Sequence, residues 1–212
     1  LGVTASAEVI QQAASWGADA LLVHHGYFWH KESPVLTGMK GQRIRALMNH
    51  QMSLVAYHLP LDCHSEFGNN KTLLDQLGFV GGQPIAKENG LLWSVPLAKS
   101  LTIDHLASKV QFALGRAPMV IESPKGSRTL SRLVVCTGGA QDYLTKALYY
   151  GADVYLSGEI SERTTHEARE LGIHYIAAGH HATERYGVQA LGQKLASSLD
   201  LEVVFFDDYN PA

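Results

Sequence analysis

The sequence predicts an α/β protein with mainly parallel sheets flanked by helices. Short apolar runs of strand length alternate with longer runs whose apolar residues recur at helical spacing. Glycines stand where several of the helical runs end. Apolar residues make up 46% of the 212 residues and charged residues 17%, a composition that suits a globular chain with a substantial core. Alternation of strands and helices is typical of parallel sheets covered by helices.

The first half of the chain follows this alternation from its start. Leu1–Thr4 is expected to end a strand, and because no Met precedes it we expect upstream residues that are missing here. The spacing then predicts a helix from Ser6 to Trp16, with Thr4 or Ser6 as its N-cap and Gly17 as its stop. The later predictions are a strand at 20–23, a helix at 41–50, a strand at 54–57 and a short helix at 71–77.

Residues 81–130 differ in texture and are predicted to form a small inserted α+β lobe. Turn-rich segments at 81–84 and 123–127 bracket this part of the chain. A strand at 91–95, a helix at 103–114 and a strand at 118–122 are predicted between them. The chain is thus divided into a first α/β half at 1–80, the lobe at 81–130 and a second α/β half at 131–212. The second half is predicted to contain strands at 133–136, 154–156, 175–178 and 201–206, and helices at 141–150, 162–171 and 183–199.

A short internal match indicates that the two halves are duplicates. WGADALL at 16–22 is echoed by YGADVYL at 150–156. The strand in the first copy runs into His24-His25, and the strand in the second runs into Gly158-Glu159. The match predicts two half-sheets that both present polar residues at the carboxyl ends of their strands, where open α/β sheets bind ligands.

Composition argues against several functional classes. Seventeen Lys and Arg against twenty Asp and Glu give a net charge of −3, which disfavours general nucleic-acid binding. No apolar run approaches the roughly 20 residues of a membrane helix, and no signal-peptide pattern is visible. The two cysteines form no CxxC motif, so we expect a reducing compartment, the cytoplasm.

Eleven histidines are the most unusual count, and several of them cluster where predicted strands end. Adjacent residues of a strand point to opposite faces. His24 and His25 therefore share one site only if the strand has ended, and otherwise each faces a different ion. Farther along, Pro60 turns the chain and leaves His58 and Asp62 at a strand exit. Taken alone, a structural histidine pair and a capping Asp62 are the simpler interpretations.

The third cluster is His180-His181-Ala182-Thr183-Glu184. His180 and Glu184 are four residues apart, which puts both on one helix face at the ligand spacing of helical zinc sites. A helix dipole explains Glu184 alone, but it does not explain two histidines after a buried run. Together the clusters predict a metal site, for which His with Asp or Glu suits Zn, Mn or Fe better than Mg. Five ligands exceed the needs of one zinc ion and suit two bridged ions: His24, His25, Asp62, His180 and Glu184.

Neighbouring side chains are candidates for further roles. Glu159, His58 and His181 are candidate acid–base or proton-shuttle residues, although Glu159 also suits a helix N-terminal acid. Tyr27 and Phe28, with Trp29 after them, are candidates for stacking on a substrate ring, and the alternative is a core or subunit contact.

These motifs resemble the signatures of the Nif-three-like family, whose members are often described as GTP cyclohydrolase I type 2 homologues. The resemblance to its bacterial YbgI type is especially close. The segments that carry the resemblance are Val23–Trp29, His58–Asp62, Thr137–Gly139, Ser157–Glu159 and Gly179–Arg185, so it spans nearly the whole chain. The resemblance implies a dinuclear site held by the same five ligands, and a toroidal homohexamer built from dimers. It also implies a purine nucleotide such as GTP as substrate, and an N-terminal helix and strand that this chain lacks.

The predicted function is a dinuclear metal-dependent hydrolase, with Asp62 and Glu184 as candidate bridging ligands and a nucleotide-type substrate attacked by a metal-bridging water. No P-loop or dinucleotide glycine fingerprint is present to hold phosphates. The alternative is a non-catalytic, metal-stabilised ring that binds a protein partner or nucleic acid, which a closed coordination shell would indicate.

Overall fold

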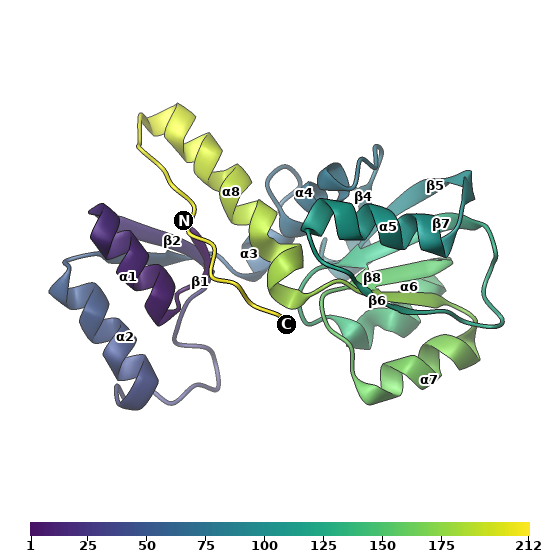
Figure 1. The fold of residues 1–212 in the computed structure, drawn as a ribbon, viewed down its shortest axis with the longest axis horizontal. Helices are drawn as coiled ribbons and strands as arrows, with labels where there is room; N and C mark the ends of the chain where they lie inside the picture. Colours follow the sequence, from purple (N-terminus) through teal and green to yellow (C-terminus); the bar gives the residue numbers. More distant parts are fainter. The chain divides into compact units, whose positions relative to one another are not determined.

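The computed structural model describes residues 1–97 and 101–212 in full, together with the backbone of residues 98–100 within a strand. The described residues form a three-stranded sheet of order β1-β2-β3 and a six-stranded sheet of order β4-β5-β7-β8-β9-β6 (Figure 1). The chain divides into two compact units. Unit 1 contains residues 1–61 and 188–209, and unit 2 contains residues 62–187 and 210–212. The predicted α/β class is confirmed.

Unit 1 is built on the all-parallel sheet. Its elements are β1 (Gly2–Thr4), α1 (Ala7–Trp16), β2 (Ala20–His25), α2 (Gly38–Asn49) and β3 (Ser53–Ala56), followed by α3 (Leu59–Asp62), whose last residue belongs to unit 2. The Ser6 hydroxyl accepts the Val9 N–H and so caps α1, as expected. Gly17 ends α1 in the left-handed region, at φ 85°. Apolar side chains of α1, β2 and α2 form one core cluster.

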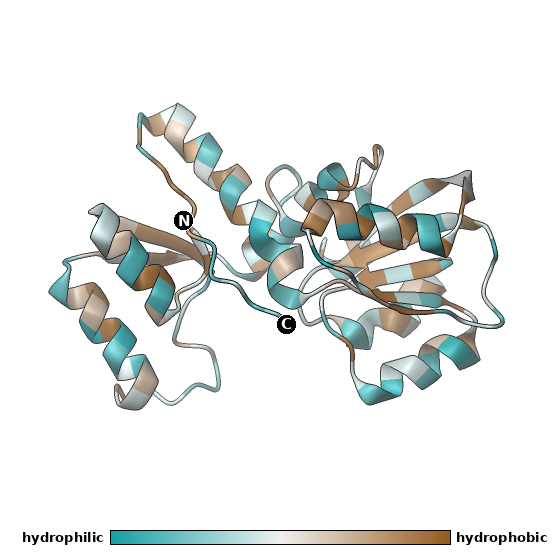
Figure 2. Cartoon of the chain, in the orientation of Figure 1, coloured by the Kyte–Doolittle hydropathy of each residue, from teal (hydrophilic) through white to brown (hydrophobic). Residues whose placement is uncertain are grey.

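Unit 2 is built on the six-stranded sheet, whose strands carry the hydrophobic residues in Figure 2. Its elements are α4 (Asn69–Gln76), β4 (Gln83–Pro84), the 3-10 helix η1 (Ala86–Glu88), β5 (Trp93–Leu101), α5 (Ile103–Leu114), β6 (Met119–Ile121), β7 (Leu130–Cys136), the 3-10 helix η2 (Gln141–Tyr143), α6 (Leu144–Tyr149), β8 (Val154–Ser157), α7 (Glu162–Leu171), β9 (His174–Ala177) and the start of α8 (His180–Leu199). The central strands β7, β8 and β9 are parallel. One face of the sheet packs with α5 and the other with α6 and α7, so two apolar clusters enclose it.

Residues 81–130 have the α+β content expected of them, and their strands join the same sheet. β5 pairs antiparallel with β7, and β6 pairs antiparallel with β9. The segment therefore supplies both edges of the unit 2 sheet, which makes that sheet mixed.

The internal echo extends to backbone geometry. Gly17 and Gly151 both take left-handed conformations, at φ 85° and 78°. The chain paths β1-α1-β2-α2-β3 and β7-α6-β8-α7-β9 each yield parallel strands in sequential order. The matched hydrogen bonds are Ala18 N–H to Ala13 O (3.0 Å) with Ala152 N–H to Ala147 O (3.1 Å), and Ser53 N–H to Asp19 O (3.0 Å) with His174 N–H to Asp153 O (3.0 Å). The short sequence match thus marks one repeated structural motif.

Two element predictions need correction. The predicted strand at 201–206 is wrong, because residues 200–212 contain no strand. The Leu1 amino group donates to Val204 O and the Phe206 N–H donates to Leu1 O, but these two bonds do not extend into a ladder. The last helix, α8, begins at His180 rather than at Thr183. Among the described residues, no helix is both long enough and apolar enough to cross a membrane.

Candidate metal centre

The five sequence-predicted metal ligands fall into two groups. His24 and His25 belong to unit 1, whereas Asp62, His180 and Glu184 belong to unit 2. Each group is a local constellation within its own unit.

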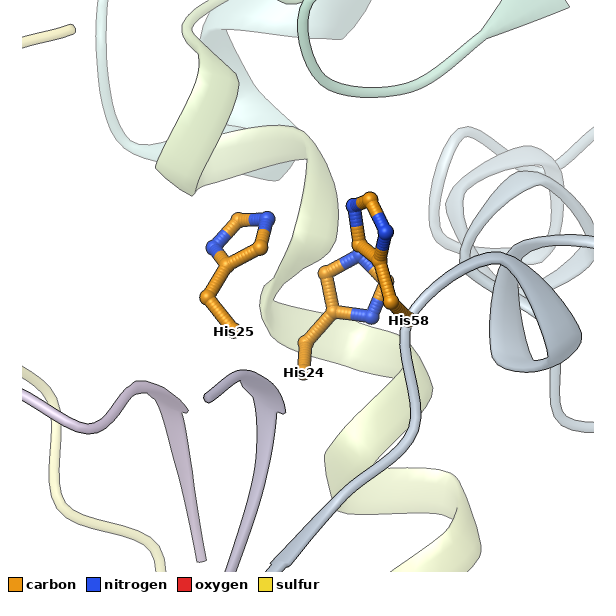
Figure 3. Close-up of side chains that lie close together, drawn as sticks. All are labelled: His24, His25 and His58. Carbon is orange, nitrogen blue, oxygen red and sulfur yellow. The ribbon is translucent and has the colours of Figure 1, made fainter. Parts of the chain in front are cut away.

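In unit 1, three imidazoles converge. One ring nitrogen each of His24, His25 and His58 lies within 4.8 Å of the other two (Figure 3). The ring centroid of His24 lies 4.6 Å from that of His25 and 5.0 Å from that of His58. His24 is completely buried. Three imidazoles at this spacing are a ligand set that suits Zn and other transition metals.

The sheet explains why these histidines meet. β2 and β3 are parallel with Val23 paired to Ala56, so both strands end at the same edge. His25 is the last residue of β2, and with the strand at its end its ring lies beside that of His24. A Cβ on Gly26 would lie 2.6 Å from the Ala56 Cβ. Glycine is therefore required after the histidine pair because the two chains approach too closely for a side chain.

Hydrogen bonds fix two of the imidazole rings. His24 Nδ1 lies 2.8 Å from the Tyr57 carbonyl oxygen, which can only accept, so this nitrogen carries the proton. His25 Nδ1 lies 3.1 Å from Thr4 Oγ1. When Nδ1 holds the proton, Nε2 carries the lone pair that a metal ion needs.

Aromatic residues follow the histidine pair, and they differ in burial. The Tyr27 hydroxyl donates to the Ala5 carbonyl while its ring packs against the unit 1 core, and burial raises the pKa of this hydroxyl. Phe28 is exposed and takes a left-handed conformation at φ 67°. The Trp29 ring, 42% exposed, lies 4.6 Å from the His58 ring and 6.3 Å from the His25 ring. Of the three aromatic residues that the sequence offers as stacking candidates, Trp29 is the one whose ring lies beside those of His25 and His58.

In unit 2, acidic groups surround His180. Its Nδ1 lies 2.7 Å from Glu159 Oε1 and its Nε2 lies 3.2 Å from Glu184 Oε2. A carboxylate oxygen of Asp62 lies within 4.8 Å of one from Glu184. Asp62 and Glu184 are only 7% and 3% exposed. Two buried carboxylates this close repel each other, and a divalent cation is the partner that best offsets their burial.

The loop after β7 makes room for Glu184. Gly138 lies in the left-handed region at φ 69°, and a Cβ there would fall 2.1 Å from Glu184 Oε1. The Gly138 N–H donates to Thr183 Oγ1 at 3.0 Å, which ties the loop to the first turn of α8. On the neighbouring loop, a Cβ on Gly158 would fall 2.6 Å from the Gly138 carbonyl oxygen. Gly138 and Gly158, at the ends of β7 and β8, thus form a cradle for the Glu184 carboxylate. Any larger residue at either position would clash with its neighbours.

Two asparagines hold Asp62, and sequence reasoning missed both. Asn69 Nδ2 donates to Asp62 Oδ1 at 2.7 Å. Asn70 Nδ2 donates to Leu91 O at 3.1 Å, and Asn70 Oδ1 accepts the Thr137 N–H at 3.0 Å. Both asparagines are completely buried. An Asn-Asn pair at a helix start suggests ordinary capping, so only the buried contacts reveal that Asn69 orients the Asp62 carboxylate and that Asn70 ties together backbone groups of Asp62, Leu91 and Thr137.

Electrostatics distinguish the titratable groups of unit 2. Burial lowers the pKa of His180, but hydrogen bonds and charges of Glu184 and Glu159 outweigh burial and raise it to about 9. Burial, followed by the charges of Asp62 and Glu184, raises the pKa of the Cys136 thiol far above its usual range. Cys136 is thus a protonated thiol close to the carboxylates. His181 is buried on α8 and, among the described residues, joins none of the ligand groups.

Fold and side chains together define an α/β protein with a candidate metal site. The family model Duf34/NIF3 (NGG1p interacting factor 3) matches residues 1–211, so the chain belongs to this family and the resemblance in the sequence is confirmed.

Relatives and solved structures agree with this assignment. A protein of Allochromatium vinosum named GTP cyclohydrolase 1 type 2 homolog is 52% identical over 211 residues, covering 100% of this chain and 82% of the relative. The protein of that name from Escherichia coli K12 is 44% identical, covering 100% and 84%. A solved structure described as protein ybgI, unknown function, superposes with a TM-score of 0.94 at 43% identity, covering 100% of this chain and 84% of that one.

Proposed function

We propose that this chain is a metal-dependent hydrolase that acts on a nucleotide-type substrate. In this proposal His24, His25, Asp62, His180 and Glu184 bind two divalent ions. The observation that carries the proposal is the pair of ligand groups, three converging imidazoles in unit 1 and a buried carboxylate pair beside His180 in unit 2. Two bound divalent ions supply a hydroxide nucleophile from water at neutral pH.

The donor set favours particular metals. Imidazole nitrogen combined with carboxylate oxygen suits Zn, Mn or Fe, whereas Mg prefers oxygen ligands and several waters. Burial, followed by the charges of Asp62 and Glu184, raises the pKa of the Cys136 thiol, and among the described residues Cys136 belongs to none of the ligand groups.

The chain's own residues have distinct tasks in this proposal. Asp62, held by Asn69, and Glu184, held against Gly138, would supply the carboxylate oxygens that hold the ions. His58 lies beside the two histidine ligands of unit 1 and holds or passes a proton, and His181 is kept as a second candidate for that task. Trp29 offers an exposed aromatic surface beside His58 on which a planar base can stack.

The substrate class is supported by the names of relatives and by this aromatic surface. Several relatives carry the name GTP cyclohydrolase 1 type 2 homolog, which points to a purine nucleotide. Phosphate groups would be held by the metal ions rather than by a glycine-rich phosphate loop, since the sequence has no P-loop.

A nucleotide panel tests the proposal directly. The metal-reconstituted full chain is incubated with GTP, GMP, guanosine and the adenine equivalents, and products are separated by chromatography. We expect turnover of at least one purine nucleotide, lost in Asp62→Asn and Glu184→Gln but kept in Glu162→Gln, which alters an exposed carboxylate on α7. Loss of folding in the first two variants would indicate a structural metal, and a fully metallated protein without turnover would favour a non-catalytic metal-binding ring.

Assembly and location remain parts of the proposal. We propose a homohexamer in the cytoplasm, on the basis of the family and of two free cysteines, Cys63 and Cys136. Light scattering should report six subunits, and a stable monomer would contradict the assembly.

A further inference from the structure

Glu159 is held more rigidly than a half-exposed carboxylate on a loop needs to be. Its N–H donates to the Gly138 carbonyl at 3.2 Å, and its own carbonyl accepts the hydroxyl of the fully buried Tyr175. Its side chain contacts His180 through Oε1 at 2.7 Å and the Gln141 amide through Oε2 at 3.4 Å. Backbone and carboxylate are therefore both fixed in one orientation.

The loop after β7 also shapes the space around this carboxylate. A Cβ on Gly139 would lie 3.3 Å from Glu159 Cδ, closer than almost all real Cβ contacts. Gly138 and Gly139 thus lie against the two carboxylates that flank His180, Glu184 on the Nε2 side and Glu159 on the Nδ1 side.

From this geometry we infer that Glu159 is a positioning residue for His180 rather than a general base. The inference rests on the proposed function, in which His180 is a metal ligand. A carboxylate that accepts the Nδ1–H fixes the orientation of the imidazole ring and places the lone pair on Nε2. It also makes Nε2 more basic, and therefore a stronger electron-pair donor to a metal ion. Oε1 is engaged by the ring and lies on the side opposite the ligating nitrogen.

The histidines of unit 1 have different partners at Nδ1 from His180. His24 Nδ1 contacts the Tyr57 backbone carbonyl at 2.8 Å and His25 Nδ1 contacts the Thr4 hydroxyl at 3.1 Å, and both of these partners are neutral groups. The Nδ1 of His180 contacts a full negative charge, and a hydrogen bond to an ionised acceptor is about twice as strong as one between neutral groups. Glu159 therefore distinguishes His180 from the two unit 1 ligands.

The test compares Glu159→Ala and Glu159→Gln with Glu162→Gln. Glu162 is a matched control because its carboxylate contacts the His166 ring at 3.1 Å on the exposed face of α7, away from the ligand groups. The first readout is the dissociation constant for Zn, measured by competition with a chromophoric chelator. The second is the downfield proton resonance of the His180 Nδ1–H, recorded with and without Zn.

We expect Glu159→Ala to weaken Zn binding by about 10- to 100-fold and to abolish the resonance. Glu159→Gln keeps a neutral acceptor, so its loss should be smaller and its resonance shifted, while Glu162→Gln should match the wild type. A residue with a merely structural role would lower the melting temperature without moving the resonance.

Two results would overturn the inference: an unchanged Zn affinity in folded Glu159→Ala, or a wild-type protein that lacks the resonance. A wild type that shows the resonance but binds no divalent ion would instead refute the proposed function, because the contact between Glu159 and His180 would then exist without a metal to serve. Circular dichroism confirms that each variant is folded before either readout is interpreted.

Discussion

The two βαβαβ motifs of this chain follow the same path, but they present different side chains where their strands end: imidazoles in unit 1, and carboxylates around one imidazole in unit 2. In unit 1, β2 ends in His24 and His25, His58 follows two residues after β3, and His24 is buried against a backbone carbonyl. In unit 2, β8 and β9 run into Glu159 and into the helix that carries His180 and Glu184. Each motif presents its polar residues at the carboxyl ends of parallel strands, where the backbone leaves groups unpaired.

The strand arrangement therefore determines where the polar residues of each motif lie, whereas the identity of their side chains determines what each motif can bind. An imidazole can be completely buried when it is hydrogen-bonded, as the contact of His24 Nδ1 with the Tyr57 carbonyl shows. Two adjacent carboxylates are costlier to bury, and the unit 2 motif surrounds them with glycine loops and a buried asparagine in a group that could hold a cation.

Neutralising the carboxylate pair should have the largest effect. Glu184→Gln removes one charge from a buried pair that a divalent ion would hold, so Zn affinity should fall more than 100-fold. In a thermal unfolding assay, saturating Zn should stabilise the wild type, by about 2.7 kcal/mol at a hundred times Kd, and leave Glu184→Gln unchanged. Equal stabilisation of both proteins would show that Glu184 is not a ligand.

The strand-end glycines of the two motifs should respond unequally. Gly138→Ala combines left-handed backbone strain with a clash against Glu184, whereas Gly26→Ala only brings its methyl against Ala56. We expect Gly138→Ala to lower the free energy of unfolding by about 1–3 kcal/mol and to weaken metal binding as well. Urea unfolding and chelator competition measure the two effects. If Gly138→Ala bound metal with normal affinity, the contact between Gly138 and Glu184 would not be needed for metal binding.

Much of this comparison could be predicted from sequence where local signals act alone. Ser6 and Gly17 mark the two ends of α1, and the match at 16–22 and 150–156 locates the repeated motif. The apolar run at 201–206 was wrongly predicted as a strand, because its two backbone hydrogen bonds to Leu1 do not continue into a ladder along β1. Asn69 and Asn70 escaped because their role depends on burial against Asp62, which arises only from tertiary packing.

The titration of His180 offers a smaller effect with a defined sign. Its pKa in the folded protein is raised to about 9, above the ordinary value of 6.5, by contacts with two carboxylates. Its contribution to the stability of the metal-free protein is therefore fully present below pH 6.5 and is lost as the pH rises through about 9. Unfolding free energies of the metal-free wild type should fall over this range more than those of His180→Gln. Parallel pH profiles would contradict the raised pKa.

The exposed tryptophans give the smallest expected change and a matched pair. Trp29 and Trp16 are 42% and 43% exposed, and each packs edge-on against another ring, His58 or Phe206. If a base stacks on Trp29, GMP should quench the tryptophan fluorescence of wild type and of Trp16→Phe but not of Trp29→Phe. GMP affinity in Trp29→Phe should fall several-fold, since one aromatic stack contributes about 0.5–1.5 kcal/mol. Quenching that persists in Trp29→Phe would place the base elsewhere.

Metal content per chain is the most direct test of the central claim that both ligand groups bind divalent ions. Elemental analysis of the Zn-loaded, desalted full chain should find about two ions per chain. The unit 1 pair His24→Ala/His25→Ala and the unit 2 pair Asp62→Asn/Glu184→Gln should each fall well below that value while remaining folded. A metal-free wild type, or full metal content in either double variant, would contradict the account.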